Sequence, residues 1–126
     1  MLYKDLYAMA QEMLPRAYAP FSKFRVGAAL LTKDGEVFTG CNVENSSFGA
    51  TICAERTAFV KAISEGSREF EAIAIVSSEG TAWPCGICRQ FIKEFCDADF
   101  KIISGDDEET LRVYTMEEML PEGFRL

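Results

Sequence analysis

The chain contains no histidine among its 126 residues. This absence excludes the Ser-His-Asp and Cys-His arrangements of nucleophilic catalysis, because both use an imidazole as the general base. It also excludes every zinc site built on imidazole nitrogens, which many zinc hydrolases use. Any metal centre in this protein must therefore take its ligands from cysteine or carboxylate side chains.

Basic residues are few, and they form no run along the chain. Lys and Arg number 13 against 20 Asp and Glu, which leaves a net charge of −7. Proteins that bind a phosphate backbone rely on clustered basic side chains. The composition therefore argues against a nucleic-acid partner and against a polynucleotide substrate, but it remains compatible with an uncharged nucleoside.

Long apolar runs are also absent. The first fourteen residues include Lys4, Asp5, Gln11 and Glu12, so we expect neither an export signal nor a membrane span. The cysteines are odd in number, which favours reduced thiols in a reducing compartment; they are Cys41, Cys53, Cys85, Cys88 and Cys96. We expect one domain over residues 1–126, located in the cytoplasm and without a membrane partner.

Helical and strand patterns succeed one another along the whole chain. Helical spacing of apolar residues predicts a first helix over 2–17, which Pro15 should end or kink. Later helices are predicted from Cys53 to about Gly66, over 86–96, and after Thr115, where Glu118 completes a capping box. Strands are predicted over 24–32, 37–43, 70–77, 100–104 and 111–114, with a hairpin turn at Asp34-Gly35.

This order predicts an α/β fold with one mixed sheet between helices. The first two strands should be antiparallel, and we expect the later strands to be parallel and joined by crossovers. In sheets of this kind, sites form where strand carboxyl ends meet helix amino termini. Cys53 opens one predicted helix, and Cys85 and Cys88 open the next, so all three fall at such a position.

Two short motifs carry the chemistry: Cys53-Ala-Glu55 and Pro84-Cys85-Gly-Ile-Cys88. Three thiolates from these cysteines can hold one zinc ion and leave its fourth position for water, as in a catalytic rather than a structural site. A zinc-bound hydroxide would attack C4 of an aminopyrimidine, with Glu55 carrying protons. Arg56 follows the first motif, and we expect it to hydrogen-bond to a ligand sulfur and offset the negative charge there.

Other interpretations of these residues remain open. The cysteines could be ordinary core residues, and Cys85 with Cys88 could form a redox pair. Cys41 could supply a fourth ligand, which would make a closed, structural zinc site in an interaction module without turnover; Cys96 lies about two helical turns beyond Cys88, too far to do so. Glu55 could simply be a first-turn carboxylate that the helix dipole favours.

Asn42 and Glu44 flank Val43 and should point the same way if the strand continues. Together they could bind adjacent sugar hydroxyls, although Asn and Glu before a loop are commonly turn residues. Phe24 and Phe124 could stack on a base, although the default location of a phenylalanine is the core.

At these residues the chain resembles the cytidine deaminases of the small, homo-oligomeric class. The resemblance covers nearly the whole chain, and four segments carry it: Tyr18-Ala-Pro-Phe-Ser-Lys-Phe24 with Val26-Gly-Ala-Ala-Leu30, Gly40-Cys-Asn-Val-Glu-Asn45, Cys53-Ala-Glu-Arg-Thr-Ala58, and Pro84-Cys-Gly-Ile-Cys-Arg-Gln90. The cysteine motifs alone would indicate only the wider zinc-deaminase superfamily. The Asn42-Val-Glu44 segment is what points to a nucleoside.

The resemblance implies a three-layer α-β-α fold with a mixed five-stranded sheet, and hydrolytic deamination of cytidine and deoxycytidine in pyrimidine salvage. It implies one zinc per subunit on Cys53, Cys85 and Cys88, Glu55 as the proton shuttle and Arg56 beside the ligands. The implied substrate contacts are Phe24, Asn42, Glu44, Ala54 and Phe124. It also implies a homotetramer with shared sites, in which Phe124 reaches an adjacent site and Phe48 lies near the subunit contacts.

The chain departs from this family at two positions. Pro15 falls where the family's first helix usually continues. Trp83 stands before Pro84, where a small polar residue is common, and its ring could narrow the pocket rim. Cytidine against deoxycytidine, another aminopyrimidine nucleoside and a nucleoside antibiotic therefore remain alternatives as substrate.

Overall fold

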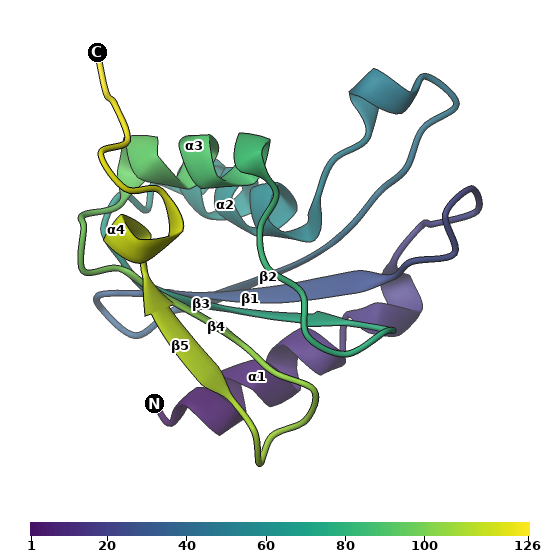
Figure 1. The fold of residues 1–126 in the computed structure, drawn as a ribbon, viewed down its shortest axis with the longest axis horizontal. Helices are drawn as coiled ribbons and strands as arrows, with labels where there is room; N and C mark the ends of the chain where they lie inside the picture. The colour runs from purple at the N-terminus through teal and green to yellow at the C-terminus, as the bar shows by residue number, and fades with distance from the viewer.

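The computed structural model describes all 126 residues. The centre of the fold is one five-stranded sheet (Figure 1). The strands are β1 (Val26–Thr32), β2 (Val37–Cys41), β3 (Phe70–Ser77), β4 (Lys101–Ser104) and β5 (Arg112–Thr115), in the spatial order β2-β1-β3-β4-β5. Strands β3 and β4 are parallel, whereas β1 is antiparallel to both β2 and β3. The sheet is therefore mixed, as predicted.

Helices cover both faces of the sheet (Figure 1). Helix α1 (Tyr3–Gln11) lies on one face, and α2 (Ala54–Ser64), α3 (Gly86–Phe95) and the short α4 (Met116–Met119) lie on the other. Side chains of β1 alternate between two cores: Ala29 and Leu31 pack with α1, whereas Ala28 and Leu30 pack with α2. The strand is buried on both faces, and the predicted three-layer architecture is confirmed.

Two predictions of local structure were wrong in part. Helix α1 ends at Gln11, and a separate 3-10 turn at Leu14–Arg16 accommodates Pro15, which cannot donate the hydrogen bond that an α-helix requires. Strand β5 is antiparallel to β4, not parallel. The connection over 105–111 is too short for a crossover, which needs about a dozen residues or more, so the chain turns back as a hairpin.

Several local signals were correct. Gly35 has a φ of 92°, as the β1–β2 turn requires, and Gly66 has a φ of 98° just beyond the end of α2. The amide of Gly66 donates to the carbonyl of Ile63, which ends the helix as predicted. The capping box of Thr115 and Glu118 is also present at α4.

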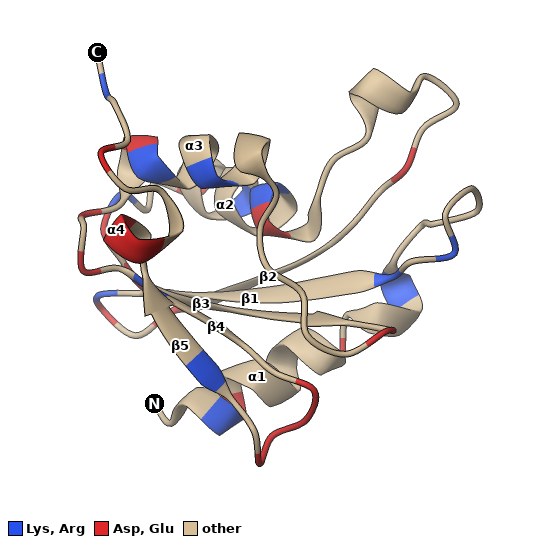
Figure 2. Ribbon diagram, viewed as in Figure 1, with Lys and Arg blue, Asp and Glu red and all other residues tan.

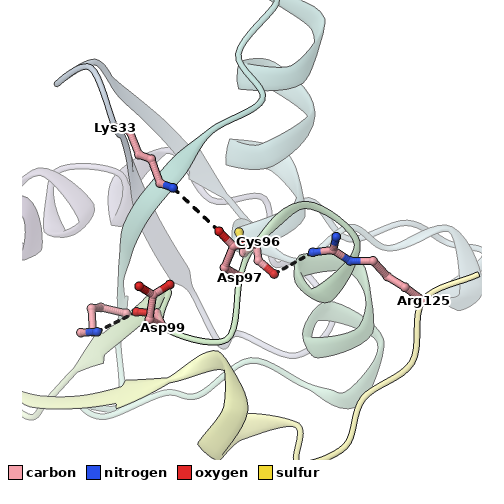
Figure 3. A network of polar contacts seen from close by, with 6 residues as sticks. Lys33, Cys96, Asp97, Asp99 and Arg125 are labelled. Atoms are coloured by element: carbon pink, nitrogen blue, oxygen red, sulfur yellow. Dashed lines mark hydrogen bonds and ion pairs between the residues drawn. The ribbon is translucent and has the colours of Figure 1, made fainter.

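The C-terminal tail lies against α3. Arg125 donates from Nε to the carbonyl of Lys93 at 2.9 Å. Its Nη2 atom donates to the carbonyl of Cys96 at 3.0 Å (Figure 3). Gln90 donates to the carbonyl of Phe124 at 3.1 Å, yet the ring of Phe124 stays 64% exposed. The tail is thus attached to α3 through the carbonyl of Phe124 and the side chain of Arg125, while the ring of Phe124 stays exposed.

Charged residues are distributed over separate elements rather than gathered in one groove (Figure 2). Lys and Arg are spread over helices, strands and loops, whereas four acidic residues follow one another in the loop between β4 and β5, at Asp106-Asp107-Glu108-Glu109. No helix of the structure combines the length and the apolar character that crossing a bilayer would need.

Candidate metal centre and substrate pocket

Two helix amino termini meet at one end of the sheet and carry the candidate ligands. Cys53 is the N-cap residue of α2, Cys85 is the N-cap residue of α3, and Cys88 lies in the first turn of α3. Unpaired backbone N–H groups and the helix dipole make such ends favourable for thiolates. The positions agree with the sequence prediction.

Helix α2 approaches the sheet closely because residue 40 is a glycine. A Cβ atom at Gly40 would lie 2.5 Å from the carbonyl oxygen of Ala54 and 2.6 Å from the amide nitrogen of Ala58. Any side chain there would push the first turn of α2 away from β2. That turn holds Glu55, so this contact contributes to the placement of the site.

The three sulfurs form a compact group that fits zinc. The Sγ atoms of Cys53, Cys85 and Cys88 all lie within 4.8 Å of one another, and those of Cys53 and Cys85 are 3.9 Å apart. Tetrahedral zinc with bonds of about 2.3 Å places its sulfur ligands about 3.8 Å apart. The donor set is therefore that of a zinc site.

The other cysteines do not join this group. The thiol of Cys41 donates to the carbonyl of Arg16 at 3.5 Å, and Cys96 is buried in the core with 2% exposure. Neither one belongs to the sulfur cluster. Three protein ligands leave one position of a tetrahedral ion open, which is the arrangement of catalytic zinc.

Hydrogen bonds among the sulfurs polarise the group. A hydrogen bond from Cys88 is the main cause that lowers the pKa of Cys53 to about 5, and Arg56 adds to it. The pKa of Cys88 is raised, chiefly by the hydrogen bond it gives to Cys53. A divalent cation bound by these three cysteines would displace the shared proton and favour the thiolate form of each sulfur.

Arg56 lies beside the first ligand as expected. Its Nη2 atom donates to the sulfur of Cys53 at 3.8 Å and to the carbonyl of Thr51 at 3.1 Å. Its Nε atom is buried without a partner. The guanidinium therefore places a positive charge against a cluster of thiolates, where it compensates part of their negative charge.

Glu55 is buried next to the sulfurs. The residue is only 4% exposed to solvent. Burial is the main cause that raises the pKa of its carboxyl to about 7, and the charge of Cys53 raises it further. Because burial penalises the charged form, this carboxyl is shifted towards its protonated form compared with an exposed glutamate.

One cavity of about 250 Å³ joins these groups. Its lining includes Cys53, Cys85 and Glu55 together with most of the predicted substrate contacts, namely Phe24, Asn42, Glu44 and Ala54. Phe124 does not line the cavity of its own chain. The cavity is at the small end of ligand pockets, so it suits a small molecule.

Asn42 and Glu44 have a structural task besides lining the cavity. The Oδ1 atom of Asn42 accepts from the amide of Val26 at 2.9 Å, and its Nδ2 atom donates to the carbonyl of Phe24 at 2.8 Å. Glu44 accepts from the amide and hydroxyl of Ser22, and the hydroxyl is the main cause that lowers its carboxyl pKa. Both side chains thus brace the segment before β1 while facing the cavity.

Sequence reasoning missed several lining residues. Trp83 was singled out as an unusual residue, but Ser22, Val26, Thr51, Ile75 and Ala82 were not identified as part of the site. Their residue types carry no chemical signal. Only the pairing of β1 with β3 and the path of the loop before α3 bring them together.

Three sulfurs at two helix amino termini, with a buried carboxylate two residues after the first ligand, define a zinc-dependent hydrolytic deaminase. Residues 2–104 match the family model of the cytidine and deoxycytidylate deaminase zinc-binding region. The chain is 48% identical to the cytidine deaminase of Sporosarcina psychrophila, over 96% of this chain and 90% of that protein. The chain belongs to this deaminase family, and zinc is its cofactor.

Two further comparisons show how similar the chain is to other deaminases. The crystal structure of cytidine deaminase from Burkholderia pseudomallei superposes with a TM-score of 0.92 at 43% identity, covering 98% of this chain and 100% of that one. The blasticidin-S deaminase of Bacillus cereus is more distant, at 31% identity over 93% of this chain and 88% of that protein.

Proposed function

We propose that the protein deaminates cytidine and deoxycytidine to uridine and deoxyuridine, with release of ammonia, as a step of pyrimidine salvage. The observation that carries the proposal is the shared cavity, whose lining includes two cysteines of the sulfur cluster, Cys53 and Cys85. The buried Glu55 and the pair Asn42 and Glu44 line the same cavity. The similarity to cytidine deaminases at both the sequence and the structural level supports the same substrate class.

Cys53, Cys85 and Cys88 would hold the zinc ion, which when bound supplies Lewis-acid activation of a water molecule. Glu55 takes one proton from this water while the oxygen adds to C4 of the base, and it delivers that proton to N3. It then moves the second proton of the former water to N4, so that the C4–N4 bond breaks and ammonia leaves. Burial of Glu55 keeps bulk water away from each transfer.

The other residues that line the cavity would bind the substrate. Phe24 packs against the base, and the backbone at Ala54 lies beside the reacting end of the cavity. Asn42 binds the ribose hydroxyls with the amide hydrogen and oxygen lone pair that its contacts to Val26 and Phe24 leave free. Glu44 accepts from these hydroxyls with the lone pairs that its contacts to Ser22 leave free. Arg56 and the two helix dipoles offset the negative charge of three thiolates on one divalent ion.

We further infer that residues 1–126 act as one catalytic domain that assembles into a homotetramer with shared sites. Two exposed rings support this assembly, because apolar side chains of this size are usually covered in a subunit contact: Phe48 is 74% exposed and Phe124 is 64% exposed. Five unpaired cysteines, three of them required as thiolates, support a reducing compartment such as the cytoplasm.

The decisive experiment follows uridine formation from cytidine by the zinc-loaded protein and its Glu55→Ala variant. We expect the variant to keep its zinc and its fold but to lose about 10²–10⁴-fold or more in kcat. Glu94→Ala, which removes an exposed carboxylate from α3, is the matched control and should keep full activity. Equal turnover by wild type and Glu55→Ala would reject the mechanism. Turnover of blasticidin S without turnover of cytidine would reject cytidine as the substrate.

A further inference from the structure

The only tryptophan of the chain, Trp83, lines the substrate cavity two residues before the ligand Cys85. Its ring is half-buried and packs edge-on against Tyr114 of β5, with centroids 5.0 Å apart and planes at 81°. The guanidinium carbon of Arg112 lies 5.4 Å from its centroid, within the range of a cation–π contact. The indole is therefore held by two residues of the edge strand and is not free to swing.

The backbone around Trp83 is tied down at the residues on both sides. The amide and hydroxyl of Thr81 donate to Asp106 at 3.1 and 2.8 Å, and the amide of Ala82 donates to the hydroxyl of Ser104 at 3.1 Å. The carbonyl of Pro84 accepts from Nε of Arg89 at 2.7 Å. The segment 81–84 thus forms a rigid wall of the cavity, fixed to the β4–β5 hairpin and to α3.

The orientation of the base follows from the proposed function, on which this inference rests. Proton delivery by Glu55 requires the N3 edge of the pyrimidine to face α2. Since N3 and C5 lie on opposite sides of C4, the C5 edge must face the other wall. The apolar lining residues that lie outside α2 are Phe24, Val26, Ile75, Ala82 and Trp83. Among these residues, Trp83 is the nearest in sequence to a zinc ligand, two residues before Cys85, and C4 must lie close to that ligand.

We propose that Trp83 is the specificity-determining residue for the C5 position of the base, and that its rigid indole excludes substituents there. A side chain that cannot move cannot make room for an added methyl group, so overpacking is relieved only by displacing the base from its reactive position. The chemical class selected is a cytosine nucleoside with hydrogen at C5.

The test compares kcat/KM for 5-methylcytidine with kcat/KM for cytidine in zinc-loaded wild type and in Trp83→Ser. We expect the ratio to rise by about tenfold or more in the variant, because one methylene-sized group in an apolar pocket typically changes specificity by 10–200-fold. A purely structural role would lower both values together and leave the ratio unchanged. Trp83→Phe keeps an aromatic ring against Tyr114 and should give a smaller rise in the same direction.

Val113→Ala is the matched control, since it shortens a 41% exposed side chain on the same strand that does not line the cavity. Its ratio should equal that of wild type. An unchanged ratio in folded, zinc-loaded Trp83→Ser and Trp83→Phe would overturn the inference, whatever the rate with cytidine.

A second readout is independent of turnover. Because Trp83 is the only tryptophan, its fluorescence emission should change saturably when uridine is added, and uridine should bind more tightly than 5-methyluridine. Calorimetry should show this preference weakened in Trp83→Phe and lost in Trp83→Ser. If wild type shows the preference but deaminates no cytidine, the proposed function fails and the inference stands. If cytidine is deaminated and calorimetry detects uridine binding without a change in emission, the inference fails alone.

Discussion

Replacing Gly40 by alanine should displace the catalytic end of helix α2. The new Cβ atom would lie 2.5 Å from the carbonyl oxygen of Ala54, and ordinary contact begins near 3.4 Å. The difference requires the first turn of α2 to retreat by about 0.9 Å, because both contact partners are backbone atoms that cannot rotate away. This turn carries Glu55 and follows Cys53 directly.

Two effects of different size should follow. Overpacking of this kind costs about 1–3 kcal/mol of stability, which lowers the Tm of a chain of this length by roughly 3–15 °C. A misplacement of about 1 Å at reacting groups costs on the order of 10²-fold in rate. The variant should therefore be folded and zinc-loaded at room temperature, with kcat for cytidine reduced about a hundredfold.

Gly27→Ala provides the matched control, because it creates an equally severe clash on the opposite face of the sheet. A Cβ atom at Gly27 would lie 2.2 Å from the carbonyl oxygen of Ala10 in α1, a helix that carries no residue of the site. This variant should lose stability and keep its kcat. Both variants are assayed well below their Tm, with Tm from circular dichroism and zinc from metal analysis.

The reasoning is refuted if folded Gly40→Ala keeps the wild-type kcat, since α2 would then tolerate the displacement. It is refuted equally if Gly27→Ala loses as much kcat as Gly40→Ala, since the loss would then reflect general destabilisation.

Two further predictions concern the metal and the assembly. Cys85→Ser should lose bound zinc on metal analysis, while Cys41→Ser should keep one zinc per chain; full zinc in Cys85→Ser would contradict the ligand assignment. Arg56→Met should bind zinc about 10–100-fold more weakly in a chelator competition, because it removes the contact to the sulfur of Cys53. Phe124→Ala should raise KM for cytidine without changing zinc content, and sedimentation of wild type should give four chains per particle; a monomer with full activity would contradict the shared site.

The grouping of the three cysteines at helix amino termini could be predicted from sequence because their spacing is local. Cys85 and Cys88 are one helical turn apart, so a helix beginning at residue 86 brings both sulfurs to the same side. Cys53 and Glu55 fall at the equivalent end of the other helix. The strand and helix order followed from periodicity, and β3 was predicted with its observed bounds.

The remaining features depend on contacts between distant segments. The direction of β5 is set by the length of its connection to β4. The apolar spacing beyond Gln11 suggested a continued helix, but the chain forms a 3-10 turn around Pro15. The apolar cavity wall, with Ile75 and Ala82, has no local signature, because such residues are equally suited to any core. The double use of Asn42, which braces the chain and faces the cavity, is likewise visible only in three dimensions.

The anchoring of the segment 81–84 has a consequence for how this enzyme can change its substrate range. All the hydrogen bonds that fix this segment use the backbone of its residues or the hydroxyl of Thr81, and none uses the side chain at position 83. The side chain at position 83 can therefore be substituted, by evolution or by design, while the position of Cys85 is retained. Substrate range and metal binding are thereby made separately adjustable within three residues of one loop.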